Sequence, residues 1–309
     1  MFKWKKQGLI FETAKHGIGA WMHNSALTPT PYRISEDIIR VYAGFRDHLG
    51  VSRIGYVDVL ADAPGTIVAV SKAPVLDIGR GGCFDDNGVI LGDVVDGPDG
   101  IYMFYVGFQL VAKAKFLAFT GLAKSFDGGT VFERVSQVPI LDRWVGQTTI
   151  RAIHSARFEK DRWKIWFASG DDWEIINGRP YPRYHIRYME TDDLLNFPKD
   201  SIVCLTPEKD EYRIGRPRVY KSGETYVMYF TKGTIGGDYF PGIAYSSDGM
   251  HWMRKDEDFG LSLSETGWDS EVLCYPALIQ NRDKIIMFYN GNDMGVDGFG
   301  FAEVAGHIA

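Results

Sequence analysis

The sequence predicts an all-β protein, and two observations support this fold class. No stretch shows a sustained apolar period of 3.6 residues, so helices are not expected to dominate. In addition, five strand-like runs end in an aromatic residue followed by a small or turn-forming residue. These runs are IIRVYAGF, IYMFYVGF, WKIWFASG, YVMYFTKG and IIMFYNGN.

The five runs recur at a nearly constant interval. Their aromatic anchors are separated by 63, 62, 63 and 59 residues and are Tyr42, Tyr105, Phe167, Phe230 and Tyr289. Further strand-like runs flank each anchor, so each unit is interpreted as about four antiparallel strands. Repetition of such units is typical of a β-propeller, whereas a two-sheet sandwich has no reason to repeat at a constant interval. The predicted fold is therefore a five-bladed β-propeller of four-stranded antiparallel blades.

We expect one domain over residues 1–309, with blade limits that follow the repeat: 12–76, 77–141, 142–205, 206–263 and 264–309. The last unit is one strand short. An N-terminal strand at 2–11, around KQGLIF, is expected to complete it and close the ring, which would remove open sheet edges. Acid-rich turns between outer strands are expected to be shaped by Asp127, Asp193 and Asp248.

Composition limits the partners and the compartment. The net charge is −6 and no basic stripe appears, so a nucleic-acid partner is not expected. The three cysteines are far apart in the chain, which fits a reducing compartment and no metal finger. The first residues lack the apolar core of a secretory signal, and no run reaches the 18 or so apolar residues of a membrane helix. We therefore expect a cytoplasmic protein with no membrane partner, no metal and no other cofactor, and its oligomeric state stays open.

Polar residues stand at the heads of the strands that would line the propeller axis. In the last blade, the stretch WDSE places Asp269 and Glu271 before the innermost strand, and Tyr275 follows them. The corresponding stretches of the other blades contribute His23, Asn24, Asp85, Asp86, Arg151, His154, Arg213 and Arg216. Trp173, in a loop, could stack on a sugar. An acid before a strand is equally often a solvated turn residue, and a one-residue slip would exchange the orientations of Asp85 and Asp86.

The sequence resembles the five-bladed glycoside hydrolases, which include invertases, levansucrases, arabinanases, xylosidases and mannoside phosphorylases. It is more closely similar to predicted glycosidase-like bacterial proteins associated with surface-polysaccharide gene clusters. The resemblance covers essentially the whole chain. It is carried by FDDNGVILGDVV, GLAKSFDGGTVFER, YHIRYMETDD, GRPRVYKSGETYVMYF, GWDSEVLCYP and MFYNGNDMGVDGFGFAEV. It implies a carbohydrate-active enzyme, a hydrolase or an enzyme of polysaccharide biosynthesis, that acts on a small-molecule or oligosaccharide substrate.

The resemblance also implies a pair of catalytic carboxylates at the axial mouth, for which Glu271 and Asp85 are the candidates. The other residues named above are candidate substrate-binding residues. The sequence departs from the invertase pattern at WMHNSA, where Asn24 stands in place of an aspartate nucleophile, and an amide cannot perform that attack.

Three hypotheses therefore stay open. The first is a glycoside hydrolase-like enzyme that uses carboxylate acid/base chemistry. The second is an enzyme of phosphate- or nucleotide-sugars that uses the cluster of arginines and histidine, because arginine binds phosphate and carboxylate groups through paired hydrogen bonds. The third is a propeller that binds carbohydrate without catalysis.

Overall fold

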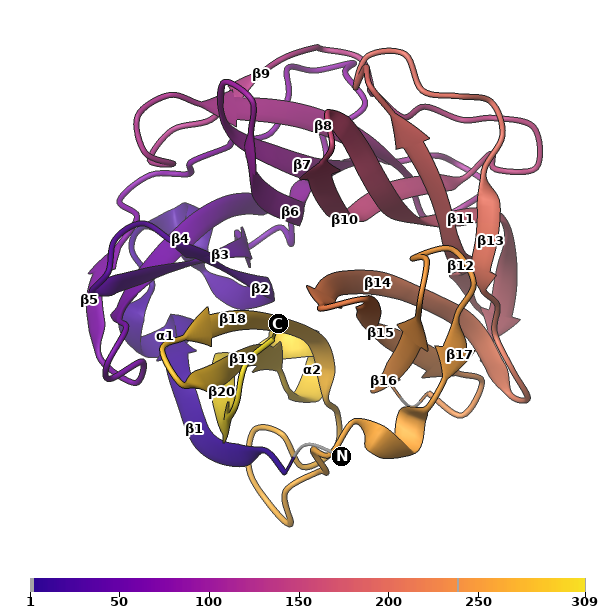
Figure 1. The fold of residues 1–309 in the computed structure, drawn as a ribbon. Helices are drawn as coiled ribbons and strands as arrows, with labels where there is room; N and C mark the ends of the chain where they lie inside the picture. Colours follow the sequence, from indigo (N-terminus) through magenta and orange to yellow (C-terminus); the bar gives the residue numbers. More distant parts are fainter. Residues whose placement is uncertain (1–2, 238, 309) are drawn as a thin grey trace.

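The computed structural model describes residues 3–237 and 239–308, and no helix in these ranges is both long and apolar enough to cross a membrane. The sheets are arranged around a central axis (Figure 1). Three positions of the predicted blades, 2, 238 and 309, lie outside the described residues.

The described strands pair as antiparallel groups of four, and consecutive strands of the chain are neighbours within each group. The first group contains β2 (Asn24–Arg33), β3 (Ile38–Arg46), β4 (Ser52–Leu60) and β5 (Ile67–Val70). The second contains β6 (Val89–Gly97), β7 (Gly100–Gln109), β8 (Leu117–Ser125) and β9 (Glu133–Arg134). The third contains β10 (Ile150–Glu159), β11 (Arg162–Ile176), β12 (Arg179–Thr191) and β13 (Ile202–Leu205).

The fourth group contains β14 (Glu211–Ser222), β15 (Thr225–Thr234), β16 (Tyr239–Ser246) and β17 (Met253–Arg254). Short parallel pairings, β8 with β10 and β12 with β14, join the second, third and fourth groups. The predicted all-β propeller of four-stranded antiparallel blades is confirmed, and the blade limits taken from the repeat stay predictions.

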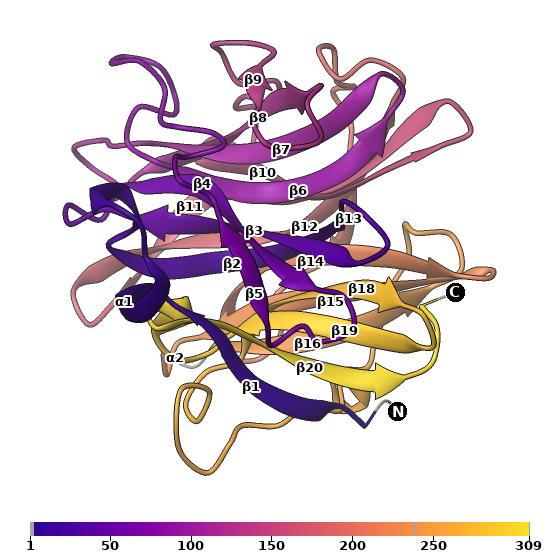
Figure 2. The same ribbon diagram turned by 90° about the vertical axis from the view of Figure 1, so that its left-hand side faces the viewer.

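The last sheet combines the two ends of the sequence. It contains β18 (Cys274–Asn281), β19 (Lys284–Asn290), β20 (Gly298–Ala305) and β1 (Lys5–Glu12). Strand β1 runs antiparallel to β20, with Lys5 opposite Glu303 and Glu12 opposite Gly298 (Figure 2). A Cβ atom at Gly298 would lie 1.7 Å from the carbonyl oxygen of Phe11, so only glycine permits this approach. The predicted closure of the ring by an N-terminal strand is confirmed.

The predicted turn residues act as expected. The Asp127 carboxylate accepts hydrogen bonds from the backbone N–H groups of Thr130 and Val131, at 3.0 and 3.1 Å. The Asp248 carboxylate does the same for the two residues that begin at Met250, both at 2.8 Å. Asp193 accepts one such bond, from Leu195, at 2.8 Å. The role of these acids in shaping the outer turns is confirmed.

The innermost strand of every group contains a β-bulge. The register shifts fall between Leu27 and Thr30 in β2, Leu91 and Asp93 in β6, Ile153 and Ser155 in β10, Gly215 and Arg218 in β14, and Cys274 and Ala277 in β18. A bulge breaks the alternation of side chains along a strand and redirects one of them. Three of these bulges contain His154, Arg216 and Tyr275, and each of these three residues lines the pocket on the axis.

One ion pair connects inner strands across the axis. Arg218 of β14 pairs with Asp93 of β6, and only 11% of each side chain is exposed. The second carboxylate oxygen of Asp93 accepts a hydrogen bond from the Ala156 N–H of β10 at 2.9 Å, and Arg218 also donates to the Thr30 hydroxyl of β2. Burial raises the pKa of the Asp93 carboxyl, and the positive charge of Arg218 opposes that rise. Four inner strands therefore meet at this pair.

We expect Asp93→Asn to lower the free energy of unfolding by about 3–5 kcal/mol, because it leaves the Arg218 charge buried without its partner. Urea unfolding of the purified protein measures this. The matched control is Asp62→Asn, which removes a 2.9 Å ion pair with Arg282 whose side chains are both 60% exposed. Asp62→Asn should lower the free energy of unfolding by less than about 1 kcal/mol. Equal losses for the two variants would contradict a central role of the cross-axis pair.

Candidate functional site

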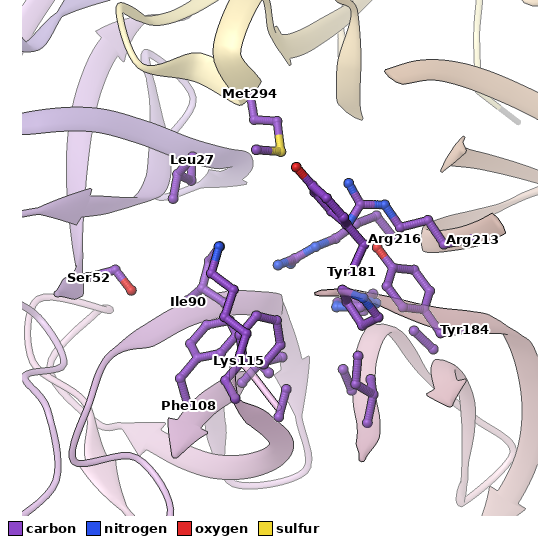
Figure 3. Close-up of a pocket in the computed structure, with 18 of the residues that line it drawn as sticks. Leu27, Ser52, Ile90, Phe108, Lys115, Tyr181, Tyr184, Arg213, Arg216 and Met294 are labelled. Carbon is purple, nitrogen blue, oxygen red and sulfur yellow. The ribbon is translucent and has the colours of Figure 1, made fainter. Parts of the chain in front are cut away.

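The innermost strands surround a pocket of about 320 Å³ on the propeller axis, which we call the axial pocket. It is lined by residues of every inner strand together with residues of β3, β4, β7, β8, β11, β12, β16, α2 (Asn292–Gly295) and the neighbouring loops. Leu27 comes from β2, Ile90 from β6, His154 from β10, Arg213 from β14 and Tyr275 from β18. Figure 3 shows Arg213, Arg216 and Tyr184 on one side of its opening, and Leu27, Ile90 and Phe108 on the other. The pocket is therefore a joint product of all the blades.

The charged side chains that line the axial pocket have one sign. They are Arg46, Lys115, Arg213 and Arg216, and no Asp or Glu among the described residues lines it. Several cations around one cavity attract anions and disfavour cations. The pocket is therefore suited to a ligand that carries a negative charge.

Arg213 is held by aromatic rings. Its guanidinium carbon lies 4.6 Å from the ring centre of Tyr239, 4.9 Å from that of Tyr212 and 5.9 Å from that of Tyr184. Rings at this distance stabilise the cation without using its N–H groups. The buried Nε of Arg213 has no hydrogen-bond partner among the described residues. Arg213 is therefore held in position by aromatic rings at the pocket.

Arg216 reaches across the axis from its bulge. It adopts a φ of 55°, and its Nη1 donates to the Leu91 carbonyl of β6 at 2.6 Å. Its guanidinium carbon lies 5.5 Å from the ring centre of Tyr275, which has a φ of 56° in the bulge of β18. Burial lowers the pKa of Arg216, so an anionic partner would stabilise its charged form. Arg216 and Tyr275 thus both adopt a left-handed backbone conformation, which stores strain at the centre of the site.

His154 adds a neutral imidazole. It lies in the bulge of β10, is 5% exposed, and its Nδ1 has no hydrogen-bond partner among the described residues. Burial lowers its pKa well below the usual 6.5, and the charges of Arg216 and Arg218 lower it further. His154 is therefore uncharged at physiological pH and can accept or donate a hydrogen bond.

The structure brings together four of the predicted site residues, His154, Arg213, Arg216 and Tyr275, in the axial pocket. Two others, His23 and Asn24, line a separate hollow of about 360 Å³ beside Trp268, together with Glu12 and Asp297. That hollow lies next to the junction of the first and last strands, since Glu12 is the last residue of β1.

The predicted acids do not line the axial pocket. Asp85 is buried, pairs with Arg134 of β9 at 2.8 Å and accepts the Tyr105 hydroxyl at 3.2 Å. Asp269 repeats this arrangement in the last sheet, with Lys6 of β1 at 2.6 Å and the Tyr289 hydroxyl at 2.9 Å. Both tyrosines are repeat anchors. An acid at the head of a blade therefore binds the anchor tyrosine of the same blade and a cation from its outermost strand.

The other two acids have different surroundings. Asp86 accepts a hydrogen bond from the Gly82 N–H at 2.8 Å, as a loop residue does. Glu271 is exposed, and its backbone N–H donates to the Asn292 side chain at 2.8 Å. The structure thus does not bring Glu271 and Asp85 together in the axial pocket, and their catalytic roles stay predictions.

Arg151 and Trp173 also lie outside the pocket lining. Arg151 is 5% exposed and donates to the Asp142 carbonyl at 2.7 Å. Burial and the charge of Arg187 lower its pKa to about 10. Trp173 packs edge-on against Phe116 at 5.3 Å, and Phe116 does line the pocket, so Trp173 supports a wall of it.

The sequence pattern did not reveal several lining residues. These are Arg46, Phe108, Lys115, Phe116, Tyr181, Tyr184 and Tyr239. Tyr181 and Tyr184 belong to β12, which forms with β11 the longest hairpin of the described residues. The aromatic stretch RPYPRY could have indicated binding residues, but the repeat does not predict which side of the blade these tyrosines face. Among the described residues, no group of three or more His, Cys, Asp or Glu side chains is placed to hold a metal ion.

Comparison with known proteins identifies a full-length relative. The uncharacterized protein Rv1502 of Mycobacterium tuberculosis is 31% identical over 311 residues, a match that covers 97% of this chain and 98% of the relative. No family model matches the sequence.

Solved structures share the fold. A structure described as a glycoside hydrolase has a TM-score of 0.71 at 16% identity, and the match covers 98% of this protein and 92% of the other. A second comes from work on glycoside hydrolases in the GH130 family of mannoside phosphorylases that target β-1,2 mannosidic linkages in Candida mannan. It has a TM-score of 0.70 at 14% identity, and the match covers 100% of this protein and 97% of the other. The fold is thus that of the glycoside hydrolase-like propellers.

We expect His154 to make folding stability fall below about pH 6.5, because the unfolded state then takes up a proton that the folded state does not. The contribution of neutral His154 to folding stability is complete above about pH 6.5 and is lost as the pH falls below this value. Between pH 7.5 and 5, the difference in unfolding free energy between wild type and His154→Gln should change by at most about 1.4 kcal/mol per pH unit. Urea titrations at several pH values measure it. The exposed His48→Gln variant should keep the wild-type profile, and an unchanged profile for His154→Gln would refute the buried neutral state.

Proposed function

We propose that this protein, which belongs to the same family as Rv1502 of Mycobacterium tuberculosis, is a glycoside hydrolase-like enzyme that takes an anionic sugar derivative into its axial pocket. The anion is a phosphate or carboxylate group on the sugar. The observation that supports the proposal is that every charged side chain that lines the pocket is positive. The described lining contains Arg46, Lys115, Arg213 and Arg216 and no acidic residue.

Arg213 and Arg216 support this proposal because both line the pocket and neither forms an ion pair with a described residue. An arginine without an anionic partner in a partly buried cavity is costly, and an anion that accepts hydrogen bonds from two guanidinium groups offsets that cost. His154 lines the same pocket as a neutral group that can form hydrogen bonds. This arrangement corresponds to the predicted alternative in which an Arg/His cluster performs the work.

A second candidate, glycosidic cleavage by carboxylates, is favoured by one observation. Glu271 is exposed and forms no ion pair among the described residues, so its carboxylate is accessible to a glycan. The mechanism needs a second carboxylate about 5–9.5 Å away. Asp85 is a weak partner because Arg134 and Tyr105 already occupy it.

The proposal also places the protein in the cytoplasm. All three cysteines are free, which supports a reducing environment such as the cytoplasm. An intracellular enzyme of this kind would act in polysaccharide biosynthesis rather than in the digestion of external polymers.

We expect glucose 1-phosphate and glucuronate to bind more tightly than glucose in isothermal titration calorimetry. Arg213→Gln and Arg216→Gln should each weaken binding of the two anions about 10-fold to 100-fold, because each variant removes charge-assisted hydrogen bonds. Arg282→Gln, which changes an arginine that is 60% exposed, is the matched control and should bind like wild type. Equal affinity for glucose and the two anions would refute the proposal.

A turnover screen tests the second candidate. Wild type and Glu271→Gln are incubated with aryl glycosides and short oligosaccharides, with and without phosphate. Loss of sugar release in the variant would support cleavage that uses Glu271, and a phosphate requirement would indicate phosphorolysis. If the variant releases sugar as fast as wild type, Glu271 is not the acid. If neither releases sugar while anions bind, the chemistry belongs to the Arg/His cluster or the propeller only binds.

A further inference from the structure

The axial pocket has two chemically different walls. The cationic wall contains Arg213 and Arg216 of β14 with the tyrosines around them. The apolar wall consists of Leu27, Ile90, Val106, Ala118, Ile150, Ala152 and Ala168, which pack as one cluster with Phe108, Phe116 and Tyr184 at its edge. In Figure 3 Arg213 lies on the opposite side of the opening from Leu27 and Phe108.

An aliphatic wall is a poor surface for a bare sugar. Hydroxyl groups surround a pyranose ring, and a hydroxyl buried against Leu, Ile or Ala side chains loses its hydrogen bonds to water without replacement. Aromatic faces can stack on a sugar, but the centre of this wall is aliphatic. Three alanines at 118, 152 and 168 leave open a space that larger side chains would fill. The wall therefore favours a hydrocarbon group.

The two walls are adjacent. Tyr184 packs against the apolar cluster, and its ring centre lies 5.9 Å from the guanidinium carbon of Arg213. Arg216 donates to the carbonyl of Leu91, the residue that follows Ile90 in β6. A ligand that contacts both walls must hence carry its negative charge close to its hydrocarbon group. A sugar with a distant charge, or a neutral sugar, would leave one of the walls unused.

We propose that the ligand is an anionic amphiphile: a phosphate-bearing sugar derivative with a hydrocarbon group adjacent to the phosphate. The phosphate binds Arg213 and Arg216, and the hydrocarbon group lies against Leu27, Ile90 and Ile150. This inference rests on the proposed function, because it specifies the substrate class of the same pocket.

Calorimetry with simple probes tests the inference on the intact protein. The probes are inorganic phosphate, glucose 1-phosphate, and methyl, butyl and hexyl phosphate, with hexyl glucoside as the neutral amphiphile. We expect affinity to rise about fourfold per methylene that the apolar wall buries. Hexyl phosphate should bind far more tightly than inorganic phosphate or hexyl glucoside.

Variants of each wall test the contributions of the two walls to affinity separately. Ile90→Thr should flatten the dependence of affinity on alkyl length, so that hexyl phosphate loses more affinity than inorganic phosphate, whereas Arg216→Gln should weaken every phosphate by the same factor. Phe108→Ser, at the edge of the cluster, serves as a second apolar-wall variant if Ile90→Thr fails to fold. Leu195→Ser, at a position 61% exposed away from the pocket, is the matched control.

The outcomes distinguish this inference from the proposed function. If glucose 1-phosphate binds but alkyl length has no effect, the amphiphile is refuted and the anionic sugar stands. If hexyl glucoside binds as tightly as hexyl phosphate, the required coupling of charge and hydrocarbon is refuted. If no phosphate binds, the amphiphile is refuted, and the proposed function is refuted with it only if glucuronate also binds no more tightly than glucose.

Discussion

The ion pair of Arg218 and Asp93 is the contact on which the centre of this propeller depends. The large apolar clusters lie between neighbouring blades, as in the one that joins Val41 and Val57 of the first group to Phe288 of the last, whereas this ion pair is a buried polar contact between inner strands. Asp93 also accepts the N–H of Ala156, and Arg218 also reaches Thr30, so β2, β6, β10 and β14 share one network. The geometry of this buried pair fixes the positions of the inner strands relative to one another, and these strands position the site.

The bulges convert this scaffold into a site. A regular strand on the axis would direct alternate side chains into the neighbouring blades. The bulges at His154, Arg216 and Tyr275 direct those side chains to the axis, and the left-handed backbone of the last two is the strain that this redirection requires. Backbone irregularities repeated around the ring hence place a histidine, an arginine and a tyrosine in the lining of the pocket.

The acids at the blade heads have a structural role that the fold explains. Asp85 with Tyr105 and Arg134, and Asp269 with Tyr289 and Lys6, form the same three-residue contact in two blades. In the last sheet the cation belongs to β1, so this contact also attaches the N-terminal strand that closes the ring. This structural role does not exclude chemistry, but it separates these carboxylates from the axial pocket.

The sequence alone determined the fold, because the anchor spacing reflects one repeated structural unit, and the turn acids and the closing strand follow from local patterns. It also singled out His154, Arg213, Arg216 and Tyr275, since polar residues at inner-strand heads converge whenever blades surround an axis. Only the tertiary structure decided which polar residues face the axis, because a bulge shifts orientation by one residue and leaves no signal in the repeat. It also decided that Asp85 and Asp269 bind tyrosines within their blades, and that aliphatic side chains of several blades form one wall, since such contacts join residues far apart in the sequence.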